Sequence, residues 1–273
     1  MTSASDTLRV AAIQLTTGAD AAANLIAAEC LVREASDRGA RLIVLPEKWP
    51  SLDVTESAPA QGPRGPWRSA ACDWARSLGI WLLAGSILES APEESRAYNA
   101  SVLFSPAGEA AASYRKIHLF DVEVGGHTYR ESATTVAGAV VATGLVDGLR
   151  VGLSICYDLR FPELYRALAD RGADVLVVPA AFTETTGRAH WEVLLRARAI
   201  ENQAFVIAAN QVGQHANGTS SYGHSMIVDP WGRILAEASD GPGIVVADLD
   251  LGQLAEIRER LPALKHRRGD VFL

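Results

Sequence analysis

The stretch LRVAAIQL, residues 8–15, has a close counterpart in LRVGLSIC, residues 149–156. Three more segments of the first half recur in the second half in the same order: GARLIVLPE with GADVLVVPA (39–47 and 172–180), WLLAGS with FVIAAN (81–86 and 205–210), and NASVLFSPAG with GHSMIVDPWG (99–108 and 223–232). Each is a short apolar run of the kind that forms a buried strand. The sequence therefore predicts two similar halves.

Segments with helical spacing lie between these strands. Residues 20–38 place apolar side chains at helical intervals and end before Gly39, a residue that favours a helix stop. IWLLAGSIL, residues 80–88, is predicted as one strand. Strands that alternate with helices indicate buried sheets. We predict an α/β fold, an αββα sandwich of two similar β-sheets with helices on the outer faces, which forms a single domain over residues 1–273. Residues 53–66, rich in Pro and Gly, are predicted as a surface loop.

The composition excludes several classes of protein. The 273 residues are 48% hydrophobic and 21% charged, with a net charge of −7, which indicates a globular core without the basic face of a nucleic-acid binder. The N-terminal segment MTSASDTLRV has no apolar stretch typical of a signal peptide, and no run of ~18 apolar residues predicts a membrane helix. The three cysteines, Cys30, Cys72 and Cys156, lack the spacing of a disulfide framework or a zinc site. We expect a cytoplasmic protein without nucleic-acid or membrane partners.

Three chemically reactive residues occur in or directly after apolar runs. Glu47 follows RLIVLP, Lys116 lies in ASYRKIHLF, and Cys156 follows VGLSI. Ligands collect at the carboxyl ends of the strands in α/β sheets, and buried polar groups are costly unless paired. A cysteine attacks as the thiolate and needs a base or a cation nearby. With Glu47 as the base and Lys116 as a fixed positive charge, the set needs neither a metal nor a cofactor.

Each of these residues also has a structural interpretation. Glu47 could be the first solvated residue after a strand, and a buried cysteine is usually a small hydrophobic residue. Periodicity does not say whether Arg115 or Lys116 faces inward. A helix with Pro162 in its first turn and Gly172 at its end is predicted just after Cys156.

The sequence resembles the nitrilase superfamily, the carbon–nitrogen hydrolases. The segments that carry the resemblance are LPE (45–47), YRKIHLFD (114–121), GLSICYDLRFPELYR (152–166), PAAFTETTGRAHWEVLLRARAIENQ (179–203), SYGHSMIVDPWG (221–232) and LPALKHRR (261–268). The likeness is strongest to the Nit branch of the superfamily. It implies a Glu–Lys–Cys constellation on an αββα sandwich, and assembly into a homodimer or a higher homo-oligomer.

The resemblance also implies roles for the residues. Cys156 would attack an amide carbonyl to form a thioester, Glu47 would transfer the protons, and Lys116 with the backbone N–H of Tyr157 would hold the oxyanion. The family pattern has a second glutamate between the lysine and the cysteine. Glu131, in YRES, matches it best.

The competitor for this position, Glu123, is closer to Lys116 in sequence but lies in a poorer context. The second glutamate would orient either the lysine or the substrate nitrogen.

The expected substrate is a small carboxylated amide that releases ammonia. Arg160, just after Cys156, could form a bidentate pair with a carboxylate, and Phe182 and Thr183 follow another strand end near the same opening. An ion pair of Arg160 with Asp158 or Glu163 is the structural alternative. The resemblance to the Nit branch implies deaminated glutathione as the expected substrate, and the alternatives are α-ketoglutaramate, an N-carbamoyl amino acid and a nitrile.

Three other interpretations remain open. A cysteine–histidine hydrolase would use His190, which lies in an apparent helix start, or His224 as its base. A metal hydrolase would use His118 and His127, although no metal-binding spacing supports it. A protein with the same fold could instead bind a metabolite or a partner without turnover.

Overall fold

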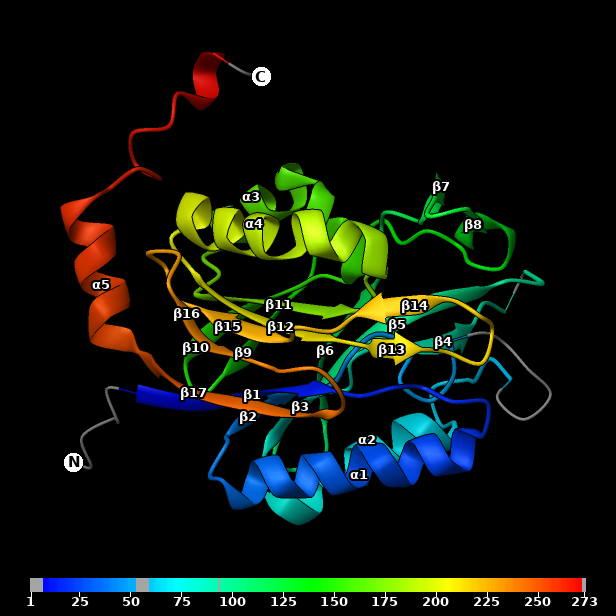
Figure 1. Cartoon of the computed structure of the whole chain (residues 1–273). Coiled ribbons are helices and arrows are strands. Elements are labelled where there is room, and N and C mark those ends of the chain that lie inside the picture. Colours follow the sequence, from blue (N-terminus) through cyan, green and yellow to red (C-terminus); the bar gives the residue numbers. More distant parts are fainter. Residues whose placement is uncertain (1–6, 53–58, 93, 272–273) are drawn as a thin grey trace.

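In the computed structural model, which describes residues 7–52, 59–92 and 94–271, two β-sheets lie face to face with helices on their outer faces (Figure 1). Helices α1 (Ala21–Asp37) and α2 (Pro66–Leu78) cover one sheet, and α3 (Pro162–Asp170) and α4 (Glu184–Asn202) cover the other. The predicted αββα sandwich is confirmed. Residues 53–58 of the predicted 53–66 loop lie outside the described residues.

The two sheets contain seven and six strands. The first sheet has the order β17-β1-β2-β3-β5-β4, with β6 also paired to β5: β17 (Gly243–Asp250), β1 (Thr7–Gln14), β2 (Leu42–Val44), β3 (Trp81–Leu83), β5 (Ala97–Phe104), β4 (Ile87–Ser90) and β6 (Ala110–Arg115). The second has the order β16-β15-β12-β11-β10-β9: β16 (Ile234–Glu237), β15 (Met226–Val228), β12 (Phe205–Asn210), β11 (Val175–Ala180), β10 (Leu149–Leu153) and β9 (Thr143–Val146).

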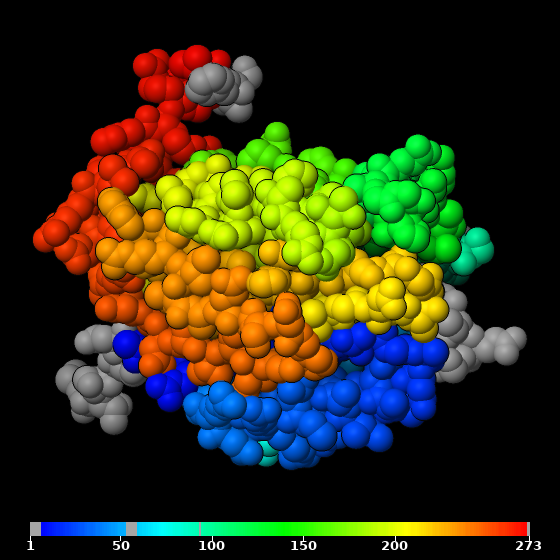
Figure 2. Space-filling view, in the orientation of Figure 1, coloured from blue at the N-terminus to red at the C-terminus, as the bar shows by residue number. Residues whose placement is uncertain are grey.

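Small elements complete the fold. Two separate hairpins pair β7 (Asp121–Val124) with β8 (His127–Arg130), and β13 (Val212–Gln214) with β14 (Ser220–Tyr222). The remaining helices are α5 (Leu251–Arg260) and the short 3-10 helices η1 (Glu131–Ala133), η2 (Cys156–Arg160) and η3 (Gly269–Val271). The segment after α5 projects from the packed body of the molecule, as Figure 2 shows in red. In the described part of the chain, no helix combines the length and apolarity needed to cross a membrane.

The repeated sequence segments occupy equivalent positions in the two sheets. In the first sheet β1, β2 and β3 are adjacent and parallel, and β5 is antiparallel to β3. In the second sheet β10, β11 and β12 are adjacent and parallel, and β15 is antiparallel to β12. The four matched segments therefore form the same four-strand arrangement twice.

The facing surfaces of the sheets share one apolar core. Val10 and Val44 of the first sheet belong to the same cluster of buried side chains as Val151, Val177 and Ile207 of the second. Burial of apolar area contributes roughly 25 cal/mol per Å², so this shared layer supplies much of the stability of the sandwich. It also fixes the carboxyl ends of β2, β10 and β11 relative to one another.

The predicted strand over residues 80–88 is wrong in one respect, because it is two strands, β3 and β4, that are separated at Gly85. Gly85 has φ +50°, and a Cβ atom there would lie 2.0 Å from the carbonyl oxygen of Pro46 and 2.6 Å from that of Leu45. The strand is interrupted where the chain passes against the backbone that precedes Glu47. Only glycine fits both the conformation and the space.

Substitution of Gly85 by Ala will therefore destabilise the protein and displace Glu47. We expect a loss of roughly 2–5 kcal/mol in the free energy of unfolding, from a left-handed alanine and an overpacked contact. Urea denaturation measures it. Gly148→Ala is the control, because Gly148 has φ +92° and a Cβ there would contact nothing within 4 Å. Equal losses in the two variants would contradict the role of the close approach.

Candidate active site

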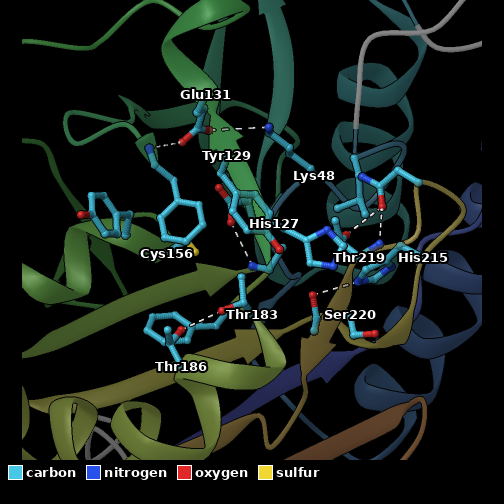
Figure 3. Close-up of a pocket in the computed structure, with 18 of the residues that line it drawn as sticks. Lys48, His127, Tyr129, Glu131, Cys156, Thr183, Thr186, His215, Thr219 and Ser220 are labelled. Carbon is cyan, nitrogen blue, oxygen red and sulfur yellow. Dashed lines mark hydrogen bonds and ion pairs between the residues drawn. The ribbon is translucent and has the colours of Figure 1, made fainter. Parts of the chain in front are cut away.

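Glu47, Lys116, Glu131 and Cys156 line one cavity of about 450 Å³. Figure 3 shows Glu131 and Cys156 in this cavity. Glu47 follows β2, Lys116 follows β6, and Cys156 begins η2 just after β10. The cavity thus lies where the parallel strands end, as expected for an α/β protein. The structure brings together the residues that the sequence placed at separate strand ends.

The Glu47 carboxylate is buried and is held by three donors. Its Oε1 accepts hydrogen bonds from Lys116 Nζ at 2.9 Å and from Asn99 Nδ2 at 2.8 Å. Its Oε2 accepts the backbone N–H of Ala181 at 2.9 Å. Since Glu47 is 3% exposed, its interpretation as a solvated residue after a strand is wrong. The donors fix both oxygens of the carboxylate inside the cavity.

Lys116 joins Glu47 to a second carboxylate. Its Nζ also donates to Glu131 Oε2 at 2.8 Å, and Lys116 is 2% exposed. Burial acts to lower the pKa of Lys116, but the charges of Glu131 and Glu47 outweigh it and raise this pKa well above its ordinary value. Lys116 therefore stays charged. Of the two neighbouring basic residues, Lys116 faces inward, whereas the exposed side chain of Arg115 pairs with the buried Glu89.

Glu131, rather than Glu123, lies beside Lys116. The Phe120 N–H also donates to Glu131 Oε2, at 2.9 Å, and Lys48 Nζ lies 3.6 Å from Glu131 Oε1 (Figure 3). Burial acts to raise the pKa of Glu131, but the charges of Lys116 and Lys48 outweigh it and lower this pKa to about 2. Glu123 lies exposed on β7 and does not line the cavity.

The Cys156 thiol lies in the cavity wall next to Glu47. Burial and the Glu47 carboxylate raise the pKa of this thiol well above its ordinary value, and the charge of Lys116 offsets this only in part. The thiol is therefore protonated at neutral pH, and the Glu47 carboxylate lines the same cavity. Cys156 also has φ +48°, a conformation that costs of order 1–3 kcal/mol and is held by the surrounding structure.

Asp158 connects the turn that carries Cys156 to the segment that carries Lys116. The fully buried Asp158 accepts Tyr114 Oη–H at 2.7 Å and Ile155 N–H at 2.9 Å, and it also binds the backbone N–H and Nδ1 of His118. The sequence pattern did not reveal this role, although the residue stands two positions after the cysteine. Its carboxylate holds the two segments in register.

Asn99 is another residue that the sequence pattern did not reveal. Its Nδ2 donates to Glu47 and, at 3.2 Å, to Glu131, while its backbone oxygen accepts the Lys116 N–H. One side chain thus bridges the two carboxylates. The signal that could have identified it is a carboxamide in the middle of the apolar strand β5.

The four residues expected to bind substrate, Tyr157, Arg160, Phe182 and Thr183, also line the cavity. The Arg160 guanidinium lies 5.0 Å from the Phe182 ring centroid and 5.9 Å from that of Tyr157, a cation–π arrangement. Its NH1 lies 3.2 Å from Nδ1 of His190.

Within the described ranges, Arg160 forms no ion pair with Asp158 or Glu163. The structural alternative for this arginine is therefore wrong.

Of the four histidines in the alternative interpretations, only His127 lines the cavity. His190 is exposed in α4, which begins at Glu184, so its predicted place at a helix start is wrong. His224 binds Glu237, at 2.7 Å, and neither His190 nor His224 lines the cavity. His118 binds Asp158, whereas His127 lies at the cavity on β8. Across residues 7–52, 59–92 and 94–271, no group of three or more His, Cys, Asp or Glu side chains is arranged to hold a metal ion.

The geometry agrees with a family model. Residues 9–259 match the model described as carbon-nitrogen hydrolase. The chain belongs to the carbon–nitrogen hydrolase family.

Named relatives share most of the chain. A deaminated glutathione amidase of Synechocystis sp. is 44% identical over 265 residues, which cover 94% of this chain and 97% of the relative. An omega-amidase of Mus musculus is 41% identical over 269 residues and 97% of each chain. The crystal structure of Saccharomyces cerevisiae Nit3, a member of branch 10 of the nitrilase superfamily, matches with a TM-score of 0.86 and 33% identity, over 96% of this chain and 97% of that one.

The lowered pKa of Glu131 predicts a pH dependence of folding stability. Because ionised Glu131 is favoured in the folded state, its contribution is complete above the ordinary pKa of 4.5 and is lost as the pH falls towards about 2. The difference in the free energy of unfolding between wild type and Glu131→Gln, measured by urea denaturation, should be constant above about pH 5.5 and shrink below about 4.5. The exposed Glu123→Gln is the control. A Glu131 difference that stays constant down to about pH 2.5 would contradict the assignment.

Proposed function

We propose that Cys156 is the nucleophile of an amidase that hydrolyses a non-peptide amide in a small carboxylated substrate through a thioester. The observation that carries this proposal is the position of the Glu47 carboxylate, which accepts a hydrogen bond from the Lys116 ammonium and shares one cavity with the Cys156 thiol. Nucleophile, base and fixed positive charge are the components that attack on an unactivated carbonyl requires.

Acylation begins with a neutral thiol. Because the pKa of Cys156 is raised, its proton passes to Glu47 as sulfur attacks the carbonyl carbon. Lys116 and the backbone N–H of Tyr157 stabilise the developing oxyanion, a contribution of about 2.7–4 kcal/mol per donor in other enzymes. Glu47 then donates the proton to the departing nitrogen, which leaves as a neutral amine.

Deacylation reverses these roles. Glu47 takes a proton from water, which attacks the thioester carbonyl, and the carboxylic acid product leaves as the Cys156 thiol is restored. Glu131 orients Lys116 and balances the lysine charge during acylation and deacylation, because the Glu131 carboxylate stays ionised.

Deaminated glutathione is the substrate that we propose, and α-ketoglutaramate is the second candidate. The names of the relatives and the Arg160 guanidinium in the same cavity as Cys156 support both, since both carry an α-keto acid at one end. Arg160 binds this carboxylate over the rings of Tyr157 and Phe182, and the Thr183 hydroxyl lies in the same wall. Hydrolysis of α-ketoglutaramate releases ammonia, whereas hydrolysis of deaminated glutathione releases cysteinylglycine through its amino group. The expected release of ammonia is therefore wrong for deaminated glutathione.

The remaining expectations stay predictions. We propose one domain over residues 1–273, which the core shared by the two sheets supports. We also propose a homodimer or higher homo-oligomer and a cytoplasmic location. Light scattering and cell fractionation are the measurements that decide them.

Release of α-ketoglutarate tests the proposed chemistry with both substrates. Cys156→Ala should abolish it, and Glu47→Gln and Lys116→Ala should each lower kcat by about 10² to 10³ or more, because a proton carrier or an oxyanion donor is lost. His224→Ala is the control and should retain activity. Circular dichroism verifies that each variant is folded. Activity retained by Lys116→Ala but lost in His224→Ala would instead support a cysteine–histidine hydrolase.

A further inference from the structure

The charges that line the cavity do not cancel. Four cationic side chains, Lys48, Lys116, Arg130 and Arg160, and two carboxylates, Glu47 and Glu131, belong to the lining. The excess is two positive charges on a chain whose net charge is −7. A cavity of one sign in a protein of the opposite overall sign concentrates ligands of the matching charge, here anions.

The pairing within the lining shows which cations are in excess. Lys116 bonds to Glu47 and Glu131, and Lys48 pairs with Glu131, so the two lysines balance the two glutamates. Among the described residues, neither Arg130 nor Arg160 forms an ion pair with a carboxylate. The charge of Arg130 acts on the carboxylate of its strand partner Asp121, which does not line the cavity. The excess positive charge of the cavity therefore lies on two guanidinium groups, the groups best suited to bind a carboxylate in a bidentate manner.

The two arginines come from different elements. Arg160 ends η2, four residues after Cys156, and lies against Phe182. Arg130 ends β8 of the separate β7–β8 hairpin and is exposed. A ligand with a single carboxylate beside Cys156 would bind only Arg160. A ligand would need a second anionic group to bind Arg130 as well.

We propose that Arg130 binds a second carboxylate, which belongs to the leaving-group half of the substrate. This inference rests on the proposed amidase function. It makes the preferred substrate class a dianionic amide, with an α-keto acid on the acyl half and an amine that carries its own carboxylate as the leaving group. Deaminated glutathione has both carboxylates, whereas α-ketoglutaramate has only the first.

The remainder of the lining suits a peptide-like leaving group. His127 of β8 shares the cavity with Thr219 and Ser220 from the β13–β14 hairpin, and Figure 3 shows these residues beyond His127 as seen from Cys156. They present hydroxyl and imidazole groups, which can hydrogen-bond to an amide. A volume of about 450 Å³ exceeds the need of α-ketoglutaramate, which is about half the size of deaminated glutathione.

The step at which Arg130 acts follows from the chemistry. Both substrates transfer the same α-ketoglutaryl group to Cys156 and so form the same thioester. The bond that breaks in acylation is the C–N bond, and cysteinylglycine or ammonia takes the proton from Glu47 and leaves. Arg130 therefore contributes to acylation by a substrate with a carboxylated leaving group, and it has no contact to make in the shared deacylation step.

A comparison of two substrates and two arginines tests the proposal, with α-ketoglutarate release as the readout. Arg130→Ala should lower kcat/KM for deaminated glutathione about tenfold, mainly through KM, as expected for one charge-assisted pair, and should change it less than about twofold for α-ketoglutaramate. Arg160→Ala should lower kcat/KM for both substrates. Arg188→Ala removes an exposed arginine that does not line the cavity, and it should affect neither substrate.

A third substrate isolates the carboxylate contact. Deaminated glutathione amidated at its glycine lacks the second negative charge, so wild type should lose about the same tenfold with it, and Arg130→Ala should lose nothing further. Equal losses for α-ketoglutaramate and deaminated glutathione in Arg130→Ala, or no loss for either, would overturn the proposal while the amidase function stands. Absence of α-ketoglutarate from every substrate with folded wild type would overturn the amidase function and this inference with it.

Discussion

The buried Lys116 ammonium, shared between the carboxylates of Glu47 and Glu131, is the interaction on which the site depends. A charge taken out of water costs several kcal/mol unless partners compensate it, and here two carboxylates face one cation at 2.9 and 2.8 Å. Lys48 supplies the second cation that brings the cluster to neutrality. Removal of one member leaves an uncompensated charge, so the group acts as a unit.

This cluster determines the protonation of Cys156, the proposed nucleophile. Hydrogen-bond donors fix the position of the Glu47 carboxylate. Burial of the Cys156 thiol, together with the negative charge of Glu47, keeps this thiol protonated. In the proposed mechanism the proton therefore stays on sulfur until a carbonyl approaches. Such an arrangement differs from a preformed thiolate, because proton transfer and attack are coupled and the resting thiol reacts little with solvent oxidants.

The structure around the cluster maintains its geometry. Asp158 links the turn that carries Cys156 to the strand that precedes Lys116. Asn99 donates hydrogen bonds to both glutamates and so bridges them. Gly85 lets the backbone before Glu47 pass at close range. These contacts come from segments far apart along the chain. The precise placement of the site residues therefore depends on the packed sandwich. Groups that the fold already holds in place stabilise a transition state without having to reorganise.

The sequence by itself determined the two halves and the reactive residues. Apolar periodicity indicates which residues are buried, so the repeated strands predicted the sandwich. Glu47 and Cys156 were identified at the ends of apolar runs, and Lys116 inside one. The break at Gly85 is invisible to periodicity because it arises from contact with Pro46, a residue remote in sequence. Only the tertiary structure decided that Lys116 rather than Arg115 faces inward, that Glu131 rather than Glu123 joins it, and that Asn99 and Asp158 hold the site. A local sequence pattern indicates which residues are buried. Hydrogen bonds and ion pairs depend instead on distances between segments remote in sequence, which no local pattern encodes.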